Sequence, residues 1–186
     1  MDLAQSLRIQ AHANALANHR LHAAMAPLDR TALHVPRVSF FPSLMATLNH
    51  ILDVDGYYIA ALHGVADADR LWREFVPADD LPELAQRQHK SDAALVAFTS
   101  TLDAAACERT VAMPRGGGRI QRDLVCHVLA HLFMHQTHHR GQVHAMLSGT
   151  SVAPPQLDEF LMASEGHLRG ADMAALGWRE DQIWPT

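Results

Sequence analysis

His135 and His139 are the two residues of this chain whose spacing most favours chemistry. They lie four positions apart, and the stretch 121–140 around them contains neither glycine nor proline. On a helix this spacing places both imidazoles on one face, one turn apart, where they can bind the same metal ion. A tetrahedral zinc site needs at least one more ligand, which another part of the fold must supply.

Other histidines of the same segment fall into groups by helical geometry. His131 continues the stripe of His135 and His139, with a drift of about 40° per step, and His138 lies at its edge, about 60° from His135. His144 is nine positions from His135, about 180° around the helix, and cannot join them. At this point a metal site and an ordinary helix, whose histidines are buried or solvated and bind no metal, are equally good interpretations, because the chain contains 14 histidines.

Neighbouring residues exclude several kinds of metal site. The zinc-protease motif requires a glutamate directly after the first histidine, and Gln136 stands there. Di-iron carboxylate bundles require Glu-x-x-His pairs, and covalent haem attachment requires a CxxCH motif; the sequence contains neither. What remains is a site of neutral nitrogen ligands with no required carboxylate.

His50 is the best candidate for the third ligand. It lies in the middle of a predicted helix, near the level at which a neighbouring helix of a bundle would face His135 and His139. The remaining candidates fall nearer to helix ends or in polar surroundings: His12, His19, His22, His63 and His89.

Four long helices are predicted to position these residues, over about 3–25, 43–62, 81–102 and 121–147. Ser43 and Asp80 are suitable N-caps, and Gly64 and Gly149 suitable ends. Residues 110–119, with Pro114 and three glycines, predict a loop or a short hairpin. The expected fold is therefore all-α, a four-helix bundle with a short loop or hairpin before its last helix and a C-terminal extension.

Composition favours one domain, since 186 residues with 48% hydrophobic and 19% charged side chains can bury a substantial core. A net charge of −5 gives no reason to expect nucleic acid as a partner. The longest apolar run, 57–62, is too short to cross a membrane, and residues 1–5 show no signal pattern, so we expect a cytoplasmic location. Only two cysteines are present, and in a reducing compartment no disulfide is expected between them.

Two stretches resemble the signatures of the DinB/YfiT-like metal-dependent family, which is the damage-inducible family and not the DNA polymerase that shares its name. They are Asn49-His50 followed by Asp55, and the octet His135-Gln-Thr-His-His-Arg-Gly-Gln that ends at Gln142. Residues 14–21 also resemble the family's first helix, although Leu16 stands where an aromatic residue is common. The match runs from about residue 3 to residue 163, in the right order and spacing.

The resemblance implies the composition of the site. One histidine of the second helix and the two ends of the HxxxH motif are the family's ligands, which correspond here to His50, His135 and His139. They would hold a divalent metal, with zinc expected in the cell and nickel acceptable to the same ligands. The resemblance also implies a homodimer, and some relatives look like transferases or isomerases that use small thiol cofactors.

Three further residues are candidates for supporting the ligands. A ligating imidazole usually donates its other N–H to an acceptor. Gln142 lies on nearly the same face as His135 and is suited either to this role or to contact with a ligand. Asp55 lies a little over one turn from His50 and either orients a ligand or pairs with Arg140 in an ordinary ion pair between helices.

Two functions remain open. The first is a metal-dependent enzyme, either a hydrolase that uses a water activated by the ion or a small-thiol-dependent transferase. The second is a non-catalytic metal-binding stress-response protein whose metal is structural. A structural site is closed by a fourth protein ligand, whereas a catalytic site keeps one position open. No catalytic residue is identified beyond the metal ligands, because the sequence shows no nucleophile paired with a base.

The end of the chain forms a separate unit in this prediction, with the bundle over 1–165 and an extension over 166–186. Trp178, Ile183 and Trp184 make the extension too apolar for a simple disordered end. We expect it to pack on the bundle or across a dimer interface.

Overall fold

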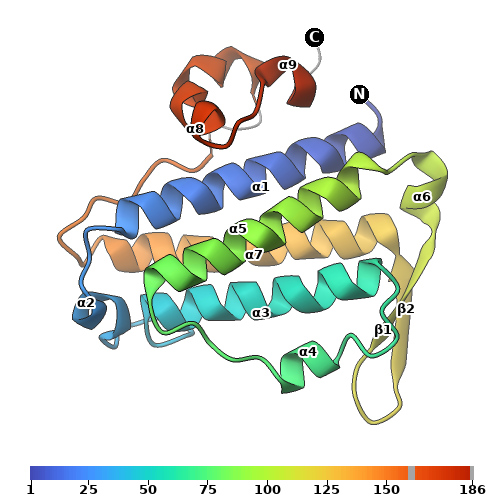
Figure 1. Ribbon diagram of the computed structural model, residues 1–186, viewed down its shortest axis with the longest axis horizontal. Coiled ribbons are helices and arrows are strands. Elements are labelled where there is room, and N and C mark those ends of the chain that lie inside the picture. Colours follow the sequence, from blue (N-terminus) through green and yellow to red (C-terminus); the bar gives the residue numbers. More distant parts are fainter. Residues whose placement is uncertain (159–161, 185–186) are drawn as a thin grey trace.

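Four long helices form the body of the protein in the computed structural model, which describes residues 1–158 and 162–184 (Figure 1). They are α1 (Leu3–Met25), α3 (Leu44–Leu62), α5 (Leu81–Ser100) and α7 (Val125–Leu147). Helix α1 contacts α5 and α7, and α3 contacts the same two helices, so the bundle closes in the order α1, α5, α3, α7. The predicted all-α four-helix bundle is confirmed.

Side-chain caps start the helices where the sequence predicts. Ser43 Oγ accepts a hydrogen bond from the Ala46 amide at 3.1 Å, and Asp80 Oδ1 accepts one from the Glu83 amide at 2.8 Å. Gly64 follows α3 with a φ of 78°, a left-handed conformation that favours glycine. The second and third predicted helices therefore begin at their caps, and α5 ends two residues before the predicted position 102.

A β-hairpin precedes α7 and shortens it at its start. Strands β1 (Thr110–Pro114) and β2 (Ile120–Leu124) pair antiparallel, and the glycines at 116–118 turn between them with positive φ. The prediction that the fourth helix begins near residue 121 is wrong, because residues 120–124 pair with β1. The absence of breakers permits either structure, and the partner strand decides between them. Tyr57 on α3 donates a hydrogen bond to the Pro114 carbonyl at 2.7 Å and holds the hairpin to the bundle.

Short helices occupy the connections and the C-terminal part of the chain. They are α2 (Arg30–His34), α4 (Arg70–Arg73), α6 (Ala104–Glu108), a 3₁₀-helix (Ala163–Leu168), α8 (Gly170–Ala175) and α9 (Glu180–Ile183). None was predicted, because elements this short show little periodicity. No helix among residues 1–158 and 162–184 has the length and apolar character required to cross a membrane.

Two apolar clusters fill the bundle, one toward each end. The first includes Tyr57 and Leu129 and lies near the hairpin, and the second includes Leu48 and Val143. Between them the long helices contribute buried polar side chains, which we call the polar layer: Asn14, Asn18, Asp55, Gln88, Asp92, Gln136 and Arg140. All four long helices contribute to it.

The C-terminal helices pack on the outside of α1, as Figure 1 shows. Met173, Ile183 and Trp184 are buried against Ile9, Leu16 and Ala17 of α1. Arg20 of α1 donates to the Asp172 carboxylate at 2.6 Å and to the backbone carbonyl of Leu168 at 3.0 Å. These contacts bury apolar surface of α1 that the four-helix ring itself leaves uncovered.

The packing predicts that the C-terminal helices contribute to global stability. Replacing Met173, which is 4% exposed, with Ala should lower the free energy of unfolding by about 2 to 3 kcal/mol, because it leaves a cavity against α1. Leu168→Ala is the matched control, since the Leu168 side chain is 45% exposed and should tolerate truncation. Urea unfolding of both variants measures the difference, and equal stabilities would contradict the packing.

Candidate metal centre

Three histidines from α3 and α7 converge on one point. The ligand nitrogens of His50, His135 and His139 all lie within 4.8 Å of one another. The Nε2 atoms of His50 and His135 are 3.0 Å apart, and the ring of His139 lies 4.6 Å from that of His50, centre to centre. The residues singled out from the sequence are thus together in the fold, although the ligands come from helices 85 positions apart along the chain.

Burial keeps the imidazoles neutral. It lowers the pKa of His50 to about 4 and that of His135 to about 3, with the neighbouring His139 lowering both further. Burial also lowers the pKa of His139 below its usual value. At neutral pH each ring therefore offers a nitrogen lone pair, and a set of three neutral nitrogens fits a divalent ion such as zinc or nickel.

Gln142 orients one of the three rings. Its Oε1 lies 2.9 Å from Nδ1 of His139, so Nδ1–H donates to it and Nε2 faces the cluster. The side-chain nitrogen of Gln142 lies 3.1 Å from Nε2 of His138, which stays outside the cluster. The supporting role considered for Gln142 is therefore directed at His139. Nδ1 of His135 is buried and has no hydrogen-bond partner among the described residues.

Asp55 and Arg140 do not form the ion pair that was one of the two roles considered for Asp55. Asp55 Oδ1 accepts from Gln136 at 2.6 Å, and Oδ2 accepts from Gln88 at 2.8 Å. Nη1 of Arg140 instead donates to the side-chain oxygens of Asn14 and Asn18. Since Asp55 is bonded to neither of the ligand histidines on α7 in the described structure, it supports the site only through the polar layer.

The polar layer is a continuous chain of hydrogen bonds. The Asn18 amide donates to Asp92 at 2.9 Å, and Gln88 donates to both Asp92 and Asp55. Burial raises the pKa of Asp55 to about 7 and that of Asp92 to about 6, and it lowers the pKa of Arg140 to about 10. Burying the charged groups of this layer therefore costs free energy, which the hydrogen bonds between the helices offset.

A cavity of about 470 Å³ lies beside the cluster and shares His50 with it. Asp53, one turn after His50, also lines this cavity; its Oδ1 is buried without a hydrogen-bond partner among the described residues. Burial raises the pKa of Asp53 to about 6. Such a carboxyl can accept or donate a proton near neutral pH. In the sequence, the one signal that points to Asp53 is its position three residues after His50.

Phe41 covers one side of the histidines. Its ring lies 4.3 Å from that of His50 and 5.6 Å from that of His139, centre to centre. The neighbouring Phe40 is 79% exposed and lies at the rim. Neither aromatic was identified from the sequence, because the irregular segment between Pro36 and Ser43 carries no periodicity.

The other histidines stay away from this point. His131 continues the stripe of α7 but is exposed and packs against Tyr58, with ring centres 5.2 Å apart. His12 packs against Trp178, and His22 is buried beside α5. Within the described parts of the chain, no fourth histidine, cysteine, aspartate or glutamate joins His50, His135 and His139. Both cysteines of the chain are free thiols.

The fold is a four-helix bundle whose second and fourth long helices bring three neutral histidines together. The protein is therefore a helical-bundle protein with a candidate metal centre. The sequence matches the DinB family over residues 6–170, and the chain belongs to this family. Comparison with curated proteins gives no significant match.

The raised pKa of Asp55 predicts a specific effect of pH on stability. Between the ordinary value of 3.8 and about 7, the folded protein keeps a proton on Asp55 that the unfolded chain loses. The contribution of Asp55 to stability is thus present at low pH and is lost as pH rises through this window. Asp55→Asn stays neutral, so its free energy of unfolding relative to the wild type should rise with pH.

Urea unfolding of the metal-free proteins at a series of pH values measures this difference. The variant is expected to fold, because Gln136 can rotate its amide and offer its unpartnered Oε1 to the new side chain. Asp67→Asn, at an exposed position, is the control. A difference between Asp55→Asn and wild type that stays constant across the window would contradict the assignment.

Proposed function

We propose that the protein is a metal-dependent enzyme that acts on a small molecule through one divalent ion held by His50, His135 and His139. Zinc is the ion proposed for the cell, and nickel fits the same ligands. The observation that carries the proposal is the convergence of three neutral imidazoles without a fourth protein ligand in the described structure. Such a ligand set leaves coordination open to a substrate, which is the arrangement of catalytic rather than structural sites.

The protein supplies orientation, shielding and a proton carrier around this ion. When bound, the ion supplies Lewis acidity, which promotes deprotonation of a coordinated water or thiol. Gln142 fixes the ring of His139, and Phe41 keeps solvent from one side of His50. Asp53 lines the adjoining cavity, where its carboxyl group can take up or return a proton.

The reaction proposed is hydrolysis or the transfer of a small thiol to an electrophilic substrate. The two differ in the nucleophile, which is the oxygen of water or the sulfur of the thiol. Membership of the DinB family is compatible with both. The non-catalytic alternative, a stress-response protein with a structural metal, requires a fourth protein ligand, and none of the described residues provides one.

Removal of one ligand should abolish metal binding. With three ligands there is little redundancy, so His135→Ala should lose stoichiometric zinc and nickel after dialysis. The control is His138→Ala, which removes an exposed histidine of the same helix outside the cluster. Elemental analysis of both purified variants decides the matter, and metal retained at one equivalent by His135→Ala would show that the ligand assignment is wrong.

Asp53 should be needed for turnover but not for metal retention. The zinc-loaded protein is tested with nitrophenyl esters, and with an electrophilic haloarene in the presence of low-molecular-weight thiols. Asp53→Asn should keep its metal and lose about tenfold to a thousandfold in kcat, because proton transfer is impaired. Equal kcat for Asp53→Asn and wild type would remove Asp53 from the proposal, and inactivity of the loaded wild type on every substrate would favour the structural alternative.

A homodimer in the cytoplasm completes the proposal. Large apolar side chains are exposed, with Phe40 beside His139 at 79% and Met134 on α7 at 73%. Exposed apolar groups of this size are typical of surfaces that meet a partner. The free state of both cysteines is compatible with a reducing compartment.

A further inference from the structure

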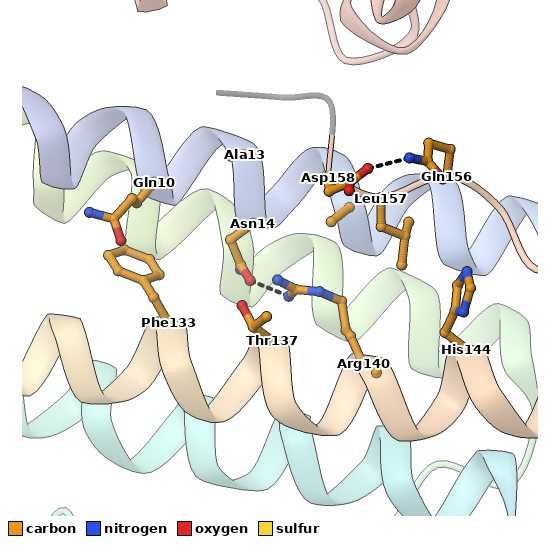
Figure 2. A pocket seen from close by; sticks show the side chains of 12 residues that line it. Gln10, Ala13, Asn14, Phe133, Thr137, Arg140, His144, Gln156, Leu157 and Asp158 are labelled. Carbon is orange, nitrogen blue, oxygen red and sulfur yellow. Dashed lines mark hydrogen bonds between the residues drawn. The ribbon is translucent and has the colours of Figure 1, made fainter. Parts of the chain in front are cut away.

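A second cavity, of about 460 Å³, lies between α1 and α7 under residues 156–158 (Figure 2). It opens on a different side of α7 from His135 and His139, because Phe133, Arg140 and His144 line it and lie about 100° to 180° around the helix from those histidines. Its size is in the range of small-molecule sites, which bind compounds in about 300–1,000 Å³. It is separate from the cavity beside His50.

Arg140 forms the polar end of this cavity. Figure 2 shows its side chain reaching from α7 toward Asn14 of α1, with Leu157 beside it. Nη1 donates to the side-chain oxygens of Asn14 and Asn18, and no hydrogen bond within the described residues uses Nε or Nη2. Neither nitrogen is among the polar atoms buried without a partner, and the side chain to which both belong lines the cavity.

The charge of Arg140 is not neutralised by a direct contact. Within the described residues no carboxylate forms an ion pair with it. The amides of Asn14 and Asn18 stand between Arg140 and Asp92 of the polar layer, with their oxygens toward Arg140 and their nitrogens toward Asp92. Asp55 lies farther along the layer, bonded by Gln88 and Gln136.

The remaining lining of the cavity consists of apolar walls and a polar rim. Ala13, Ala17, Phe133 and Leu157 give it apolar walls. Asp158 lies at the exposed rim, where its carboxylate accepts a hydrogen bond from Gln156. Nε2–H of His144 donates to the Pro155 carbonyl at 3.0 Å and ties the covering segment to α7. A buried guanidinium with two unused donors therefore lines a cavity whose walls are partly apolar.

We propose that this cavity is a binding site for a small organic carboxylate, with the carboxylate on Arg140 and an apolar body between Phe133 and Leu157. A guanidinium binds a carboxylate through paired hydrogen bonds, and two donors on adjacent nitrogens suit this arrangement. Burial strengthens the interaction because little water competes. The site is independent of the metal and stands on a different side of α7.

Binding is tested with phenylacetate, and with phenylacetamide and phenethylamine as neutral and cationic probes of the same shape. Isothermal titration calorimetry on the chelator-treated full chain should show phenylacetate binding at least tenfold more tightly than either probe, because only the carboxylate satisfies Arg140. Equal affinity of the carboxylate and the amide, or no binding of phenylacetate at millimolar concentration, would overturn the proposal.

A variant at Gly141 locates the site without disturbing the polar layer. Gly141 lies on the exposed side of α7 with no atom within 4 Å of an added Cβ, so Gly141→Leu should fill the cavity and weaken phenylacetate binding by tenfold or more. Ala145→Leu is the control, one turn along the same helix at an exposed position outside the cavity. Arg140→Gln should weaken binding similarly, provided that its circular dichroism spectrum matches that of the wild type.

His135→Ala separates this site from the metal centre. Phenylacetate binding should be unchanged in this variant, whether or not the proposed metal centre exists. Binding that is lost in His135→Ala but kept in Gly141→Leu would place the carboxylate at the metal centre and overturn the proposal. These experiments can therefore refute the carboxylate site without refuting the metal centre, and they can also support the carboxylate site if the metal centre is refuted.

Discussion

Charged groups inside a helical bundle must be compensated by hydrogen bonds, and in this protein the compensation is shared among all four long helices. Arg140 of α7, Asp92 of α5 and Asp55 of α3 are linked by the amide side chains of the polar layer. The side-chain amide nitrogens of Asn18, Gln88 and Gln136 donate to these two carboxylates, so a rotation of any one helix would break a hydrogen bond of a buried polar group. The register of α3 against α7 follows from this layer, and the meeting of His50 with the two histidines of α7 depends on that register.

The sequence predicts those features that local rules decide. Ser43 and Asp80 mark helix starts because an N-cap acts within three residues, and the spacing of His135 and His139 places them on one face of any helix. The start of α7 could not be obtained in this way, because residues 120–124 have no breaker and become a strand only through pairing with β1. Local sequence is silent about partners that lie elsewhere in the fold.

The same distinction, between features set by local sequence and features set by contacts in the fold, applies to the candidate site. The three candidate histidines were found from the helical spacing of His135 and His139 and from the resemblance to a family signature, whereas Phe41 comes from an irregular segment and meets His50 only in three dimensions. The Asp55–Arg140 ion pair, one of the two roles considered for Asp55, shows the opposite error. The two residues have opposite charge and lie in facing helices, yet Asn14, Asn18 and Gln136 are better placed to bond them. Proximity within a bundle does not decide which of several polar partners an ion takes.

Phe41 lies on a segment that is anchored separately from the bundle. The Arg37 amide donates to the Pro42 carbonyl at 2.7 Å, and the Arg37 guanidinium reaches the carbonyls of Ala32 and Gly149. The cover of the histidines is thus built from a closed loop, while the histidines themselves belong to helices fixed by buried polar bonds. Loops accept changes of sequence and length more readily than packed helices do. Exchange of this one loop can therefore alter what covers the three histidines, at little cost to folding and with the histidines left in place.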